Sequence, residues 1–175
     1  MKCYCLYCKT GSESKLVDLL KNSMHNYLNV EAEIFYPLRV MNQKNRGIWR
    51  SVEQPLLPGY LFLYLDKEIP FPTFLISQER NAYKVLRYSD GTMALKDQDE
   101  KYALWVYRHK GSFEASTVLF KEGQMIKVID GPLMEMDGQI VKIDRHHKRV
   151  VVEMMFAGAL RRVNLSINII EESNS

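Results

Sequence analysis

Residues 59–65, Gly-Tyr-Leu-Phe-Leu-Tyr-Leu, alternate aromatic and aliphatic side chains. Successive side chains of a β-strand point to opposite faces, so this run predicts a strand with rings on one face and leucines on the other. We expect the aliphatic face to pack beneath helices. The aromatic face is either a second packing surface or an exposed binding platform.

The segment before this strand predicts a strand, a helix and another strand. Residues 2–8 are rich in apolar, aromatic and thiol side chains, as in a buried strand. Ser12 can cap a helix, because apolar residues then recur at three- and four-residue steps. We expect a second strand over residues 31–41. The polar, glycine-closed stretch 42–47 suits a hairpin turn.

Two helices and one strand are expected after residue 65. Residues 74–79 predict a short helix and residues 83–88 a strand. Asp97, with Glu100 three residues later, resembles a capping box that begins a helix ending near Arg108. This order of elements indicates an antiparallel sheet with helices packed on it.

The character of the sequence changes after Arg108. Residues 109–119 are polar at first and lack periodicity, so we interpret them as a linker. Five short β-rich runs then follow, separated by turns such as Asp130-Gly131-Pro132: 125–129, 139–143, 150–155, 160–165 and 167–170. They suggest a small closed β-barrel of the SH3-like kind. The expected fold is therefore α+β, with one domain over 1–108, the linker over 109–119 and a second domain over 120–172.

Composition sets broad limits on function. No apolar run reaches the roughly 18–20 residues of a membrane span, and the chain starts without a secretion signal, so we expect a cytoplasmic protein with no membrane partner. The net charge of +3 lies in residues 1–119, with 16 Lys/Arg against 13 Asp/Glu; residues 120–175 balance at 8 against 8. Contacts with nucleic acid in the second half must therefore come from a local cluster.

Cys3, Cys5 and Cys8 form the one cluster of potential metal or redox ligands near the start of the chain. A fourth Cys or His at zinc-site spacing is missing from their neighbourhood, and cysteine also packs well in a buried strand. We expect the packing role, with no metal and no cofactor. A glycine-rich phosphate loop and a Ser/His/Asp or Cys/His set at usable spacing are also missing, so we do not expect an enzyme.

Two stretches resemble a known family. Residues 123–132 and 137–144, Gly-Gln-Met-Ile-Lys-Val-Ile-Asp-Gly-Pro and Asp-Gly-Gln-Ile-Val-Lys-Ile-Asp, resemble the KOW motif. With the N-terminal half they resemble the NusG family, in which an NGN domain precedes a KOW domain. Residues 4–11 and 53–62 are most similar to a specialised paralogue in that family, RfaH. The β-prone residues 150–152 and 167–170 instead fit a barrel-type KOW domain, as in the antiterminator LoaP.

The resemblance implies sites for three partners. Tyr7, Pro58, Tyr60 and Phe62 would line a cavity for the clamp helices of the largest subunit of RNA polymerase, although burial in the core is the simpler reading of strand aromatics. Lys9, Lys15 and Arg80 would approach upstream DNA, or else are solvated surface charges. A basic cluster would contact nascent RNA, or is a solvated hairpin tip. Its members are Lys142, Arg145, His146, His147, Lys148, Arg149, Arg161 and Arg162.

The implied function is processive antitermination of specific operons by a monomer bound to RNA polymerase. The alternatives are a general NusG that couples the polymerase to Rho or the ribosome, and a ribosome-associated RNA-binding KOW protein. Residues 156–165 depart from the NusG loop that binds Rho or a ribosomal protein, because they lack its proline and are more basic. The added charge favours RNA as the partner.

Overall fold

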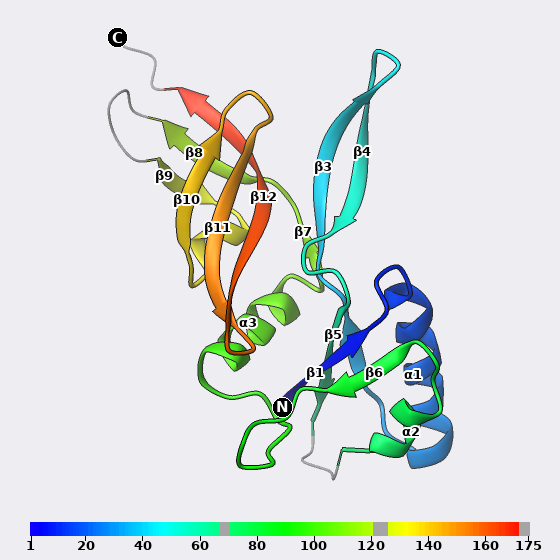
Figure 1. The fold of residues 1–175 in the computed structure, drawn as a ribbon. Coiled ribbons are helices and arrows are strands. Elements are labelled where there is room, and N and C mark those ends of the chain that lie inside the picture. The colour runs from blue at the N-terminus through cyan, green and yellow to red at the C-terminus, as the bar shows by residue number, and fades with distance from the viewer. Residues whose placement is uncertain (67–70, 121–125, 172–175) are drawn as a thin grey trace. The chain divides into compact units, whose positions relative to one another are not determined.

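The computed structural model describes residues 1–66, 71–120 and 126–171, and these form two compact units. The first unit contains Met1–Pro37 and Leu57–Gly111, and the second contains Leu38–Leu56 and Ser112–Ser175. Helices and strands are mixed within the chain (Figure 1), as the expected α+β class requires.

The first unit is built on a four-stranded sheet. Its order is β2 (Glu33–Phe35), β5 (Tyr60–Leu65), β1 (Lys2–Cys8) and β6 (Ala82–Val85). Every pairing in it is antiparallel, as predicted. The register of β1 with β5 places Cys5 opposite Phe62 and Tyr7 opposite Tyr60. Since paired residues share a face, the aromatic side chains of the two strands gather on one side of the sheet.

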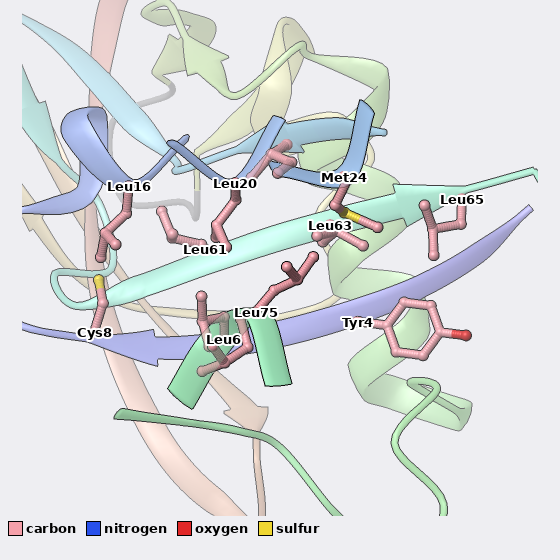
Figure 2. Packing of buried hydrophobic residues seen from close by; sticks show 12 residues of the cluster. Tyr4, Leu6, Cys8, Leu16, Leu20, Met24, Leu61, Leu63, Leu65 and Leu75 are labelled. Atoms are coloured by element: carbon pink, nitrogen blue, oxygen red, sulfur yellow. The ribbon is translucent and has the colours of Figure 1, made fainter. Parts of the chain in front are cut away.

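Helices α1 (Glu13–Leu28) and α2 (Thr73–Ser77) cover the leucine face, as the alternation predicted. Figure 2 shows Leu16, Leu20 and Met24 of α1 directed at the leucines of β5. The buried cluster contains Tyr4, Leu6, Cys8, Leu16, Leu20, Met24, Ile34, Leu61, Leu63, Leu65, Leu75 and Ile76. Each fully buried leucine stabilises the fold by about 1.5–3 kcal/mol, so this face supplies much of the stability of the unit.

Helix α3 (Asp97–Arg108) covers part of the aromatic face. The hydroxyl of Tyr64 donates a hydrogen bond of 2.7 Å to the carbonyl oxygen of Ala103, and the Phe62 ring lies 5.5 Å from the Tyr102 ring. The predicted capping box at the start of α3 is wrong. Lys96 is the N-cap and makes no side-chain capping bond. The carboxylate of Asp99 instead accepts a hydrogen bond from the Tyr88 hydroxyl.

The predicted strand over residues 31–41 is two strands in two different sheets. Pro37 separates β2 from β3 (Leu38–Asn45), because proline cannot donate the ladder hydrogen bond. Strand β3 pairs with β4 (Ile48–Pro55) and with the short β7 (Ser112–Phe113). The turn between β3 and β4 is shorter than residues 42–47. Arg46 and Gly47 have φ values of 49° and 84°, as in a two-residue hairpin turn.

The C-terminal sheet has five strands. Their order is β10 (Gln139–Asp144), β11 (Arg149–Phe156), β12 (Ala159–Glu171), β8 (Ser116–Phe120) and β9 (Lys127–Asp130), with the 3-10 helix η1 (Pro132–Met134) after β9. The predicted strands 160–165 and 167–170 are one long strand, β12. Its first part pairs antiparallel with β11 and its last part pairs parallel with β8. Met125, the first residue of another predicted strand, lies outside the described residues.

The stretch 109–119, which we expected to be an irregular linker, contains β7 and most of β8. Strands are held by backbone hydrogen bonds, so the polar side chains there do not prevent pairing. Ser116 is 1% exposed, and its hydroxyl oxygen accepts a hydrogen bond of 3.0 Å from the Leu133 amide. A buried serine with this partner carries no apolar signal in the sequence.

Gly131→Ala should lower the free energy of unfolding by about 2–4 kcal/mol, because an unfavourable φ is combined with a steric clash. Gly131 has a φ of 96°, and a Cβ atom there would lie 2.7 Å from the Ser116 Cα atom. Gly158→Ala in the same unit is the matched control, since its φ is 71° but no atom lies within 4 Å of the added Cβ. Chemical denaturation of both variants checks this prediction. Equal losses of stability would show that the clash with Ser116 has no cost.

Candidate functional site

The aromatic face of the first sheet ends in a half-buried pair of tyrosines. The ring centroids of Tyr7 and Tyr60 are 4.7 Å apart, and the Lys84 ammonium lies 5.5 Å from the centroid of the Tyr7 ring. Pro58, two residues before Tyr60, is exposed. The structure thus brings Tyr7 and Tyr60 together at a partly accessible surface, with exposed Pro58 in the turn just before Tyr60. We call these three residues, all predicted for the polymerase cavity, the tyrosine surface.

Phe62, the fourth predicted residue, lies in a different environment. Its side chain is 0% exposed and packs edge-on against Tyr102 of α3. It therefore lies beside the tyrosine surface on the same face of β5, covered by α3, and does not line that surface. The two alternatives for the aromatic face both hold in part: the portion under α3 is core, and the portion at Tyr7 and Tyr60 is partly open. Burial raises the pKa of Tyr64 and of Tyr102, so both hydroxyls in the core portion stay protonated.

Glu13 holds the loops beside the tyrosine surface. The residue is 3% exposed, and its carboxylate accepts hydrogen bonds from the backbone amides of Gly59, at 2.8 Å, and Gly11, at 2.6 Å. The Cys8 amide donates to the Gly59 carbonyl at 2.9 Å. Gly59 has a φ of 81°, and an added Cβ atom would lie 3.0 Å from the Cys8 carbonyl oxygen. The turn that precedes Tyr60 is therefore held by two backbone hydrogen bonds of Gly59 and by its close packing against Cys8.

Sequence reasoning missed Glu13 and assigned the start of α1 to Ser12. Ser12 is the N-cap residue, but its side chain makes no capping bond. The available signal was an acidic residue in the first turn of a helix, where a carboxylate is favoured by the helix dipole. That signal does not reveal a partner 46 residues away, because only the folded chain brings Gly59 to the helix start.

The three cations expected at upstream DNA are all exposed. Lys9 and Arg80 lie on neighbouring loops, since the Lys9 amide donates a hydrogen bond of 2.8 Å to the carbonyl of Asn81. Lys15 belongs to the first turn of α1, two residues after Glu13. These positions place the cations on segments that adjoin the tyrosine surface in the chain or through a backbone hydrogen bond.

The cysteines divide between the two faces of β1. Cys8 belongs to the cluster under α1, whereas Cys3 and Cys5 pair with Tyr64 and Phe62 on the opposite face. Burial raises the pKa of the Cys3 and Cys8 thiols to about 11. The thiols are thus protonated near neutral pH and point in different directions, which is the packing role that the sequence favoured. Among the described residues no group of three or more His, Cys, Asp or Glu could hold a metal ion.

The basic cluster of the second unit is centred on the turn between β10 and β11. Asp144 accepts hydrogen bonds from the His147 amide, at 2.9 Å, and from His147 Nδ1, at 2.8 Å, and these bonds lower the pKa of Asp144. The Arg145 guanidinium lies 3.1 Å from the centroid of the Phe120 ring. Lys142 and the residues Arg145 to Lys148 are exposed, so their side chains are accessible to solvent or to a ligand.

Arg161 and Arg162 do not extend this cluster as a pair. They are adjacent in β12, so they face opposite sides of the sheet. Arg162 forms an ion pair of 2.6 Å with Glu153, whereas Arg161 is opposite the buried Met154.

Sequence reasoning missed Arg39 of β3, whose guanidinium donates a hydrogen bond of 3.0 Å to the Asn164 carbonyl. Burial first, and then the charge of Arg149, lowers the pKa of Arg39.

A family model described as transcription termination factor nusG matches residues 1–101, more than half of the chain. The chain belongs to the NusG family. The protein is therefore a transcription termination/antitermination factor of the NusG family, and the membership expected from the sequence is confirmed.

Relatives match the chain over almost its whole length. The NusG of Buchnera aphidicola is 26% identical over 97% of this chain and 95% of its own. The NusG of Escherichia coli K12 is 21% identical, with the same coverage of both chains. A solved structure that concerns domain interaction in Thermotoga maritima NusG matches with a TM-score of 0.60 and 20% identity, over 94% of this chain and 93% of that one. The structural likeness confirms the α+β fold.

None of the helices in the described part of this NusG-family chain has the length and apolar character that a membrane crossing requires. The longest of these helices, α1, has 16 residues and carries a polar face.

Glu13→Gln should lower the free energy of unfolding of this NusG-family protein by about 1–3 kcal/mol, because an amide nitrogen would face a buried backbone N–H donor. Asp18→Asn on the exposed face of α1 is the matched control and should change stability by less than about 0.5 kcal/mol. Chemical denaturation monitored by circular dichroism measures both. If both substitutions have the same small effect, Glu13 does not fix the turn at Gly59.

Proposed function

We propose that the protein binds RNA polymerase through the tyrosine surface and promotes processive antitermination at specific operons. The presence of half-buried Tyr7 and Tyr60 on the otherwise covered aromatic face is the observation that carries this proposal. Membership of the NusG family supports it. The proposed partner is the helical coiled coil of the clamp of the largest subunit.

The chemistry of the tyrosine surface suits an amphipathic helix. Tyrosine rings provide a large contact area, lose little conformational entropy on binding and often dominate the energy of interfaces. The bonds from Gly59 and Gly11 to Glu13 hold the Pro58–Tyr60 segment in place before a partner arrives. Binding to a surface that is already ordered costs less conformational entropy than binding to one whose loops must first be ordered.

The proposed mechanism is a shift in the population of polymerase conformations. A factor that binds the elongating form more tightly than the paused form stabilises elongation by its difference in affinity. A hundredfold difference corresponds to about 2.7 kcal/mol, enough to convert an evenly populated pair of states to one that is about 99% elongating. This mechanism requires binding alone.

Two basic regions would direct the factor to its nucleic acids. Lys9, Lys15 and Arg80 would contact phosphates of upstream DNA. The turn between β10 and β11, with Lys142, Arg145 and Lys148 exposed, would contact nascent RNA. The domain division 1–108, 109–119 and 120–172 and the likeness to LoaP belong to this proposal.

Tyr7→Ala combined with Tyr60→Ala should weaken binding to purified RNA polymerase by roughly 30-fold or more, the effect of removing interface anchors worth about 2 kcal/mol. Tyr27→Ala is the matched control, because Tyr27 is 70% exposed and lies on α1. We exclude Phe62→Ala, since removing this buried ring should cost about 3–5 kcal/mol of folding stability. Co-purification and titration measure binding; unchanged binding by a folded double variant would remove the polymerase proposal.

Arg145→Ala combined with Lys148→Ala should reduce affinity for a structured RNA. It should also lower the slope of log affinity against log salt by about 0.7–0.9 for each phosphate that the variant no longer neutralises. Lys21→Ala combined with Arg87→Ala removes the same two exposed charge types from the first unit and serves as the control. Filter binding at several salt concentrations measures the slope. Identical slopes for both double variants would mean that the turn does not contact RNA.

A further inference from the structure

The β3–β4 hairpin carries an exposed tryptophan that packing does not explain. Residues 42–50 are all exposed, and Trp49 has 67% of its surface accessible. The cross-strand partner of Trp49 is Lys44, and the next pair on that face is Asn42 with Ser51. The indole therefore stands among polar neighbours, where it buries little apolar surface. Figure 1 shows β3 and β4 as a long two-stranded ribbon.

The hairpin region also carries a net positive charge equal to that of the whole chain. Residues 38–56 contain Arg39, Lys44, Arg46 and Arg50 against Glu53, a net charge of +3. The whole chain has 24 Lys/Arg against 21 Asp/Glu, so the remaining residues balance at 20 against 20. A narrow ribbon with this excess of charge favours a polyanionic ligand.

The register of the tip places cations on both faces of the ribbon. Lys44 is directly opposite Trp49 and shares its face, and Arg46 lies in the two-residue turn. Arg50 follows Trp49 in the strand and faces the other side of the ribbon. An exposed ring flanked by basic side chains is the combination that binds single-stranded nucleic acid, in which bases stack on the ring and phosphates contact the cations.

We propose that the β3–β4 hairpin is a second RNA-binding site, at which Trp49 stacks on an unpaired base while Lys44 and Arg46 contact the flanking phosphates and Arg50 adds to the positive charge of the ribbon. The choice of RNA rests on the proposed function of the basic turn between β10 and β11. That turn and the hairpin belong to the same compact unit.

The root of the hairpin is hydrogen-bonded to β12, the strand that pairs with β11 next to the basic turn. The Ser166 hydroxyl donates a hydrogen bond of 2.7 Å to the Val40 carbonyl, and Arg39 donates to the Asn164 carbonyl. Arg149, at the end of the basic turn, is close enough to Arg39 to interact with its charge. The basic turn and the root of the hairpin therefore adjoin through Arg149 and Arg39.

The fluorescence of Trp49 provides a direct test with the full chain. The chain has two tryptophans, and Trp105 is 2% exposed, so quenching by a stacked base would report on Trp49. Titration with a single-stranded oligouridine of about twelve nucleotides should quench the emission. Trp49→Phe should abolish the quenching, and Trp49→Ala should weaken the binding of labelled RNA by roughly 5- to 150-fold. Tyr83→Ala, which removes a 62% exposed ring from β6, is the matched control.

The remaining measurements distinguish RNA binding by the hairpin from RNA binding by the turn between β10 and β11. Loss of RNA affinity in Trp49→Ala, with normal affinity in Arg145→Ala/Lys148→Ala, would support the hairpin and refute the turn; the reverse result would overturn the hairpin site. Stronger quenching by duplex DNA than by oligouridine would overturn the assignment to single-stranded RNA. Weaker polymerase binding by Trp49→Ala with unchanged RNA affinity would assign the hairpin to the polymerase and overturn the proposal. Unfolding midpoints should stay unchanged, because the substituted side chains are exposed.

Discussion

The antiparallel pairing of β1 with β5 divides the first unit into an aliphatic face and an aromatic face. Each paired residue shares a face with its partner, so Leu6 joins Leu61 under α1 while Tyr7 joins Tyr60 on the other side. Burial of the leucine face supplies stability, which leaves the other face free to serve a second purpose. Helix α3 covers the portion at Phe62, and the portion at Tyr7 and Tyr60 stays half-buried. The candidate polymerase surface is therefore a consequence of strand register.

Glu13 shows how a buried charge can position such a surface. A carboxylate inside a protein is costly unless hydrogen bonds replace its water, and the amides of Gly59 and Gly11 provide them. The same bonds bring the end of β1, the start of α1 and the turn before Tyr60 together. Stability and the shape of the proposed binding surface thus depend on one side chain. Gly59 must also remain free of a Cβ atom, because its φ is 81° and a Cβ atom would lie 3.0 Å from the Cys8 carbonyl oxygen.

The second unit has a different basis. Strand β12 spans Ala159–Glu171 and changes partner along its length, from β11 to β8, so it connects the parts of the five-stranded sheet. Its backbone and side chains also hold β3, through Asn164 with Arg39 and Ser166 with Val40. The unit therefore presents two basic segments that are far apart in sequence. One is the turn at Arg145–Lys148, and the other is the β3–β4 hairpin.

The sequence by itself determined the α+β class, the two faces of β5, the extent of α3 and the resemblance to NusG, because side-chain periodicity and local turn residues act over a few positions. It did not reveal β8, the break at Pro37 between two sheets or the continuity of β12, because strand pairing is decided by distant backbone partners. The burial of Phe62, the bonds of Glu13 to Gly59 and the contact of Arg39 with Asn164 were likewise decided by the tertiary structure. The physical reason is that burial and buried hydrogen bonds depend on which residues meet in space, whereas a strand pattern records only how side chains alternate.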